Sequence, residues 1–367
     1  MSVGIGIIGL PESGRTTVFN ALTKGNAATG IQAPKAPHIG ISKVPDARLT
    51  KLAGMFNPKK IVPAEIKYLD IGASIKGIGK DSSISGELLT QLSNVDALIN
   101  VVRYFSDDSI AHSSGSIDPS RDIDNMNMEL SFSDLTIMER RMERIANSLK
   151  SAKADERQQY KNEQDLLAKI KTDLENDIPI REQKLTEEEK KLIVGYQFLS
   201  AKPLLTIVNI GESQLADTNK IEQEMNTEFG TANHHVIAFC GNLEMELAQL
   251  DDEESAASFR SDFGLTEPGL DRVIKQSYAL LGLISFLTAG ADECRAWPIT
   301  EGTVAQKAAG KIHSDIERGF IRAEIISYED LINCGSLAEG KKRGLLRLEG
   351  KTYVVKDGDI INFLFNV

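Results

Sequence analysis

Cysteine is scarce in this chain. Three cysteines occur among 367 residues, at Cys240, Cys294 and Cys334, and no two of them form a C-x-x-C pair. Such isolated thiols exclude a disulfide framework and a cysteine-based metal site. We therefore expect a protein of the reducing cytoplasm.

Long hydrophobic runs and an excess of basic charge are also lacking. The start "MSVGIGIIGL" has no basic n-region and is soon interrupted by Glu12 and Arg15, and no later run approaches the roughly 20 apolar residues of a membrane span. The 42 basic and 53 acidic side chains give a net charge of −11, which argues against bulk nucleic-acid affinity but leaves a local basic patch open. We expect a cytoplasmic protein without a membrane segment.

Signatures of several hydrolase classes are missing. The sequence has no nucleophile elbow and no H-E-x-x-H, and His38, His234, His235 and His313 show no metal-ligand spacing. These four histidines are interpreted as structural or surface residues. Hydrophobic residues make up 41% and charged residues 26%, which is typical of a globular protein, and the length predicts two or three compact units.

Short apolar runs that alternate with helical stretches indicate an α/β sheet with crossover helices. The predicted strands are "VGIGIIG", "AEIKYLD", "ALINVVRYF", "KPLLTIVNI" and "HHVIAFC". Behind the last of these, after Tyr278, a smaller α+β module is expected, in which "TYVV" and "IINFLFNV" form a hairpin around "KDGD".

The region from Met128 to about Lys191 is rich in charged residues and carries apolar positions at alternating steps of three and four, the seam of a coiled coil. It predicts an antiparallel helical hairpin inserted in the α/β domain. Its charges are interpreted as a solvated face, with a partner-docking surface as the alternative. The apolar positions are Leu135, Met138, Met142, Ile145 and Leu149, then Leu167, Ile170 and Leu174.

The stretch "GLPESGRTTVFNALT" nearly matches the phosphate-binding pattern G-x-x-x-x-G-K-[ST]. In such a loop, backbone N–H groups converge on phosphate oxygens at a helix N-terminus. Ser13, Gly14 and Arg15 would surround a β-phosphate, and Thr16 stands where a hydroxyl binds Mg²⁺. A tight turn without a ligand is the alternative.

Arg15 replaces the usual lysine of this loop. Guanidinium keeps the positive charge but is planar and wider than an ammonium group. Phosphoryl transfer depends on positioning, so nucleotide binding is the safer expectation than turnover.

Several strings together resemble the YchF/Obg-like ATPase family of P-loop proteins, in the GTPase-like TRAFAC class. Among them are "GLPESGRTTVFNALT", "VPDARLTKLAGMFNPKKIVPAEIKYLDIG", "SGSIDPSRDIDNMNMELSFSDL" and "TAGADECRAWPITEGTVAQKAAGKIHSDIERGFIRAEIISYEDL". The resemblance covers almost the whole chain in order. It identifies the sequence as a degenerate member of that family.

The resemblance implies an α/β P-loop NTPase domain of Rossmann-like type, with an inserted antiparallel coiled coil and a C-terminal ubiquitin-like β-grasp (TGS) domain. The corresponding ranges are 1–128 and 192–280 for the OBG-type nucleotide-binding domain, 129–191 for the coiled coil and 281–367 for the TGS domain.

The resemblance also implies a preference for ATP over GTP, with Mg²⁺ as cofactor, and association with ribosomes, with RNA contact through the TGS domain. His112 matches the family's catalytic histidine, and Thr16 and Asp70 match its metal ligands. Residues matched to nucleotide binding are Glu12, Ser13, Gly14, Arg15, Thr16, Thr17, Asn209, Ile210 and Glu212. Without the resemblance, Asn209 and Glu212 would be interpreted as ordinary polar loop residues, and spacing alone would not distinguish a catalytic His112 from a loop histidine without a role.

Departures from the family pattern affect the γ-phosphate sensors. The first switch, "APKAPHIGISKVPD", has no threonine, and Ala73 stands for a glycine in the second switch after Asp70. Two hypotheses follow, a slow ATPase that switches a ribosome-facing surface and a nucleotide-binding regulator with little or no hydrolysis. A third is an RNA- or ribosome-binding protein without nucleotide, for which the basic run "EGKKRGLLR" would serve as contact.

Overall fold

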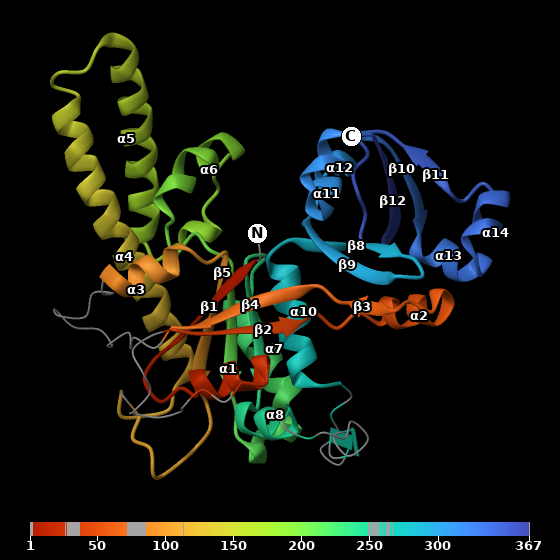
Figure 1. The fold of residues 1–367 in the computed structure, drawn as a ribbon. Helices are drawn as coiled ribbons and strands as arrows, with labels where there is room; N and C mark the ends of the chain where they lie inside the picture. Colours follow the sequence, from red (N-terminus) through yellow and green to blue (C-terminus); the bar gives the residue numbers. More distant parts are fainter. Residues whose placement is uncertain are drawn as a thin grey trace. The chain divides into compact units, whose positions relative to one another are not determined.

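The computed structural model describes residues 3–25, 27, 37–71, 86–112, 114–248, 250, 257–258, 260–261, 265 and 267–366. Its contacts divide the chain into two compact units (Figure 1). The first comprises residues 3–40 and 67–270, and the second comprises residues 41–66 and 271–367. The sequence analysis assigned residues 41–66 to the nucleotide-binding domain, whereas their contacts place them in the C-terminal unit.

A six-stranded sheet forms the centre of the first unit, in the order β2-β4-β1-β5-β6-β7. The pairs from β4 through β7 are parallel, as expected for strands joined by crossover helices. Strand β1 is buried along its whole length, because parallel strands are covered on both faces. The five strands predicted from the sequence are confirmed. The bounds are β1 Gly4–Gly9, β2 His38–Lys43, β4 Glu65–Asp70, β5 Ala97–Arg103, β6 Leu204–Asn209 and β7 His234–Phe239.

Helices cover this sheet through two apolar clusters. Side chains of α3 and α4 pack with β1, β5 and β6 around Leu98, and side chains of α7 and α8 pack with β6 and β7 around Val208. None of the described helices is long and apolar enough to cross a membrane. The helices of this unit include α1 Arg15–Thr23, α3 Gly86–Ser93, α6 Glu187–Ile193, α7 Thr218–Phe229 and α8 Gly241–Ala248.

Two long helices, α4 (Pro119–Ser148) and α5 (Ala154–Glu175), lie side by side in the same unit (Figure 1). The two apolar stripes predicted from the sequence meet in one cluster, in which Met138, Ile145, Leu167 and Ile170 are fully buried. Helix α4 begins at Pro119, ten positions before the expected boundary, because Asp118 caps it by accepting a hydrogen bond from the Arg121 N–H at 3.1 Å. The turn between the helices falls at residues 149–153, where the sequence gave no clear signal.

The C-terminal unit has its own six-stranded sheet, in the order β11-β10-β12-β8-β9-β3. Most neighbours are antiparallel, but β12 with β8 and β3 with β9 are parallel. The core contains Phe286, Ile325, Ile361 and Phe363 together with apolar residues of α11. The strands are β3 Lys60–Val62, β8 Leu283–Ala289, β9 Glu293–Thr300, β10 Phe320–Ser327, β11 Arg347–Glu349 and β12 Asp359–Phe365, and the helices are α2 Ala47–Phe56, α11 Ala305–Ile312, α12 Ser314–Arg318, α13 Tyr328–Cys334 and α14 Leu337–Lys342.

The predicted hairpin at the end of the chain is wrong. Residues "TYVV" form no strand beside β12 and make one isolated bridge, between Val354 and Val304. Strand β12 pairs instead with β10 and β8, which come earlier in the chain. The turn residues "KDGD" were recognised correctly, but nothing in a local pattern tells which distant strand takes the partner position.

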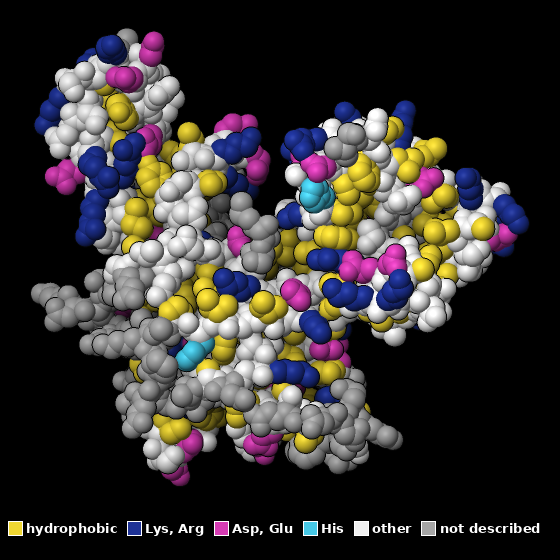
Figure 2. Space-filling view, in the orientation of Figure 1, with side chains coloured by type: hydrophobic (Ala, Val, Ile, Leu, Met, Phe, Trp, Pro, Cys, Tyr) yellow, Lys and Arg dark blue, Asp and Glu magenta, His cyan; other side chains and the backbone are white. Residues whose placement is uncertain are grey.

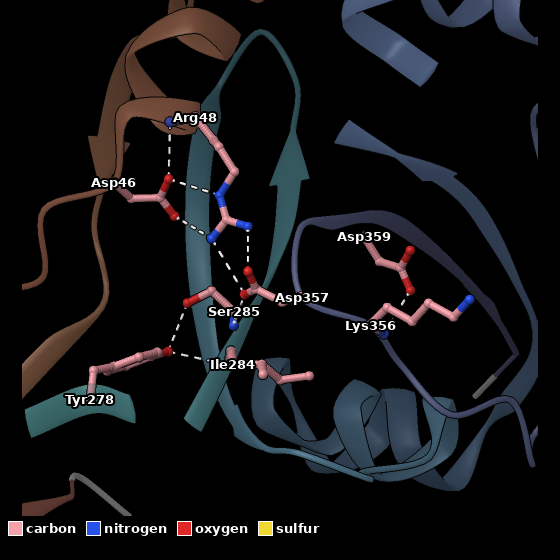
Figure 3. A network of polar contacts seen from close by, with 8 residues as sticks. All are labelled: Asp46, Arg48, Tyr278, Ile284, Ser285, Lys356, Asp357 and Asp359. Carbon is pink, nitrogen blue, oxygen red and sulfur yellow. Dashed lines mark hydrogen bonds and ion pairs between the residues drawn. The ribbon is translucent and has the colours of Figure 1, made fainter. Parts of the chain in front are cut away.

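A polar network fastens residues 41–66 into the C-terminal unit (Figure 3). Arg48 donates to Asp46 at 2.8 Å and to Asp357 at 2.7 Å, and Asp357 also accepts the Ser285 N–H at 2.8 Å. Burial alone would lower the pKa of Arg48, yet its bonds to the two aspartates raise that pKa above its ordinary value. Asp46 additionally caps α2 by accepting the Arg48 N–H at 2.9 Å.

We expect Asp46→Ala to destabilise the C-terminal unit by about 1–2 kcal/mol, because it removes a helix cap and a charge-assisted bond together. Trp297, the single tryptophan of the chain, lies in β9 and reports the unfolding of this unit in urea. Asp292→Ala is the matched control, because the Lys59–Asp292 pair is 81% and 88% exposed and its loss leaves the midpoint unchanged. Equal midpoints for the two variants would contradict a fastening role of Asp46.

Candidate functional site

The loop between β1 and α1 is held by close backbone packing. A Cβ on Gly9 would lie 2.6 Å from the Val101 carbonyl oxygen, and one on Gly14 would lie 2.1 Å from Asn209 Nδ2. Gly14 also has φ +86°, a conformation that side chains rarely adopt. Glycine is therefore required at both positions by geometry.

Asn209 braces this loop from the end of β6. Its Nδ2 donates to the Ser13 carbonyl at 3.0 Å, and its Oδ1 accepts the Gly241 N–H at 3.0 Å. The residue is only 4% exposed. The sequence analysis assigned Asn209 to the nucleotide, whereas in the structure both polar atoms of its side chain bind backbone groups.

The other residues expected to bind nucleotide lie on the same loop or after β6. Ser13 is buried, and its Oγ has no hydrogen-bond partner among the residues that the structure describes. Such an orphaned hydroxyl fits a loop that is built to receive a polar ligand. Ile210 is buried in an apolar cluster, and Glu212 is exposed at the start of a short 3₁₀ helix. Glu12, Gly14, Arg15, Thr16 and Thr17 are partly exposed around the first turn of α1.

The two expected metal ligands lie together. Thr16 Oγ1 donates to Asp70 Oδ2 at 2.9 Å, and Asp70 is buried at the end of β4. A hydroxyl and a carboxylate are hard oxygen donors and suit Mg²⁺. This donor pair therefore fits the ion.

Arg15 binds the same carboxylate, that of Asp70. Its Nε donates to Asp70 Oδ1 at 2.6 Å, so that one oxygen of Asp70 faces Arg15 and the other faces Thr16. A guanidinium on a buried carboxylate supplies the positive charge that a cation would otherwise supply. Arg15 therefore stands in competition with Mg²⁺ for Asp70.

His38 was missed as a site residue. Its Nδ1 lies 3.6 Å from Asp70 Oδ2, too far for a hydrogen bond but close enough for charge to matter. The sequence feature that could have identified His38 is its position in the first switch string, directly after Pro37. Residues 28–36 of that region and both Gly72 and Ala73 of the second switch lie outside the described residues.

His112 comes from the segment that follows β5. Its Nε2 lies 3.0 Å from Asp122 Oδ2, and its Nδ1 accepts the Ser114 N–H at 3.1 Å. The imidazole is only 7% exposed, and with Asp122 it lines a small void whose other walls include Pro11 and Ser13. The expected catalytic histidine is thus close to the phosphate loop but oriented by a carboxylate.

Arg103 and Asp122 were not predicted. Arg103, at the end of β5, donates to the carbonyls of Phe105, Asp107 and Ile110 and so folds the segment that leads to His112. The available signal was a single arginine directly after the apolar run "ALINVV". Asp122 had no signal beyond its place in the first turn of a helix.

All of these groups lie at the carboxyl ends of the parallel strands. The phosphate loop follows β1, Asp70 ends β4, Asn209 ends β6, and the His112 segment follows β5. Ligands of open α/β sheets bind at this edge. The geometry can hold a polyphosphate on backbone amides, a divalent cation on two oxygens, and an imidazole nearby.

Comparisons with known proteins find relatives that span the whole chain. The family model YchF-GTPase_C, described as a protein of unknown function, matches residues 283–366. The curated "Ribosome-binding ATPase YchF" of Bacillus subtilis is 42% identical over 371 residues, and its namesake in Escherichia coli O157:H7 is 40% identical over 375 residues, each with 100% of both chains covered.

The solved structure of the Schizosaccharomyces pombe YchF GTPase superposes with a TM-score of 0.86 at 30% identity, covering 99% of this chain and 98% of that one. This match extends over both units of the chain. On full-length similarity of both sequence and structure, the chain belongs to the YchF family.

Proposed function

We propose that this chain binds ATP with Mg²⁺ at the β1–α1 loop, hydrolyses it slowly and acts in association with the ribosome in the cytoplasm. The observation that carries this proposal is the braced loop, in which Asn209 and two sterically required glycines hold the backbone open. The names of the curated relatives, which call them ribosome-binding ATPases, support the nucleotide and the partner. GTP is a second candidate, because the matched fission-yeast structure is titled a GTPase.

In this proposal the N–H groups of Ser13, Gly14 and Arg15 bind the β-phosphate at the start of α1. Thr16 and Asp70 hold the ion, which neutralises phosphate charge when bound. His112 is kept in one orientation by Asp122 at Nε2, and its Nδ1 acts on the attacking water once the Ser114 N–H leaves that atom. Glu12, Thr17, Ile210 and Glu212 complete the nucleotide contacts.

The domain roles belong to the same proposal. The unit of residues 3–40 and 67–270 carries the nucleotide and includes the coiled coil of residues 129–191. The unit of residues 41–66 and 271–367 contains the TGS domain, at 281–367, with RNA contact. The basic run of α14 supports that contact, because Lys341, Lys342 and Arg343 are all exposed. This surface is a local exception to the net charge of −11.

A second candidate function is nucleotide binding with little or no hydrolysis. The Arg15–Asp70 pair at 2.6 Å favours it, because a protein side chain holds an oxygen that the ion needs. In that case ATP stabilises a conformation and is not consumed.

Titration calorimetry with ATP and Mg²⁺, followed by phosphate release with and without ribosomes, separates the candidates. We expect binding and slow release. Binding without release, even with ribosomes present, would establish the second candidate, and failure to bind ATP or GTP at millimolar concentration would contradict both.

Gly14→Ala tests the loop itself. The new Cβ would clash with the Asn209 side chain, so ATP affinity is expected to fall at least about tenfold while the chain stays folded. Gly302→Ala is the matched control, because Gly302 has φ +83° but no atom within 4 Å of the added Cβ, and it lies in the C-terminal unit. Equal ATP affinity in both variants would place the nucleotide elsewhere.

Arg15→Lys tests the competition for Asp70. A lysine can leave the carboxylate for the phosphates, so we expect turnover to rise about tenfold and half-saturation with Mg²⁺ to occur at a lower concentration. Arg318→Lys, a substitution of an exposed arginine on α12, is expected to leave both quantities unchanged. If Arg15→Lys also changes neither, the switches and not the loop limit hydrolysis.

His112→Ala tests the proposed catalyst. Phosphate release is expected to fall about 100-fold, with ATP affinity retained, because the imidazole acts on the water and not on the nucleotide. His235→Ala, on β7, serves as the histidine control. Unchanged release in His112→Ala would remove this residue from the mechanism.

A further inference from the structure

The C-terminal sheet has a split between two strands. Strand β12 pairs with β10 along its whole length, from Asp359 to Phe365. On its other side, among the described residues, β12 pairs with β8 at one position only, Ile360 opposite Leu287. Beyond Leu287, strand β8 continues to Ala289 in pairing with β9 and no longer pairs with the described residues of β12.

A cavity of about 590 Å³ lies along this split. Its walls are the β8–β9 turn around Gly290 on one side and successive residues of β12 on the other. Both Asn362 and Phe363 line it, although neighbours in a strand point to opposite faces of a sheet. A cavity can contact residues on both faces of a sheet only where it runs along the edge of a strand. The edge of β12 therefore borders this cavity.

The two faces of the split differ in chemistry. On the inner face, Ile312 and Ile316 lie beside Phe363, whose ring belongs to the core. On the outer face, Asn362 donates to the Glu324 carboxylate at 2.8 Å. Figure 2 shows hydrophobic side chains gathered on the C-terminal unit around α11 and α12.

The charge of the lining has one sign. The residues that line the cavity include three carboxylates, Asp292, Glu293 and Glu324, and neither a lysine nor an arginine. Two of them have cationic partners outside the lining, Lys59 at 2.8 Å and Arg295 at 3.8 Å. The Lys59–Asp292 pair is exposed and the Arg295–Glu293 pair is partly exposed and long, so both contribute little and a cationic ligand can replace them at low cost.

We propose that this split is a docking site for an extended, basic segment of a partner protein, which adds a strand to the edge of β12. Main-chain hydrogen bonds to an open edge give affinity, and alternate side chains give specificity. Apolar side chains of the segment face Ile312, Ile316 and Phe363, and its lysines or arginines face Glu324 and Asp292. RNA is disfavoured here, because its phosphates would meet the carboxylates.

The probe is a fluorescein-labelled peptide of about eight residues that alternates lysine with valine, a length typical of a strand. Fluorescence anisotropy with the full chain measures its binding without nucleotide, so the result does not depend on the proposed ATPase function. We expect binding at least about tenfold tighter than for the same peptide with glutamate in place of lysine. Equal affinities, or no binding at millimolar concentration, would overturn the proposal.

Two variants locate the site. Glu324→Lys is expected to weaken binding at least about fivefold by reversing charge at the outer face, and Glu301→Lys, at an exposed turn outside the lining, leaves binding unchanged. Ala291→Trp places a large ring at the exposed end of the split and is expected to abolish binding without loss of fold, as checked by far-UV circular dichroism. Binding that survives Ala291→Trp, or a labelled oligouridine that binds wild type and is lost in this variant, would contradict a peptide site.

Discussion

The close approach of backbone to backbone beneath the first loop is the constraint on which the site depends. Gly9 lies against Val101 of β5, and Gly14 lies against the side chain of Asn209, so the loop is fixed between three neighbouring strands of the parallel sheet. Because these contacts are made by main chain and by one buried amide, they hold without any ligand. The loop is therefore preorganised, and the ordering cost of a bound polyphosphate is small.

On this fixed loop the electrostatics centre on one buried carboxylate. Asp70 is bound by Arg15 and Thr16 of α1 and lies 3.6 Å from His38 of β2, so side chains from two segments meet at this carboxylate. A second carboxylate, Asp122, orients His112 in the same manner. The site thus contains two aspartates that position other groups, and Arg15 places a guanidinium on the first of them.

Local sequence pattern predicted the strands of the first unit and the apolar stripes of α4 and α5, because burial in those elements follows a short period. The loop glycines and Thr16 were also predicted from their spacing, and Asp70 was predicted from the family resemblance; the structure brings Thr16 and Asp70 within hydrogen-bond distance. The pairing of β12, the start of α4 at Pro119 and the pairing of Arg15 with Asp70 were not. Each of these depends on a contact between residues that are distant in the chain, or on a cap that competes with the apolar pattern, and periodicity contains no information on either.

The passage of residues 41–66 through the C-terminal unit has a consequence for how such a protein evolves. The chain supplies β3 and α2 to that unit, with Arg48 bonded to Asp357, before it returns to form the strand that ends at Asp70. A single recombination point near residue 280 would leave the C-terminal part without its edge strand β3. The N-terminal part would keep helix α2 without the unit on which it packs. A recombination that moves the C-terminal unit would therefore have to carry residues 41–66 with it to keep the β3–β9 pairing and the Arg48–Asp357 bond.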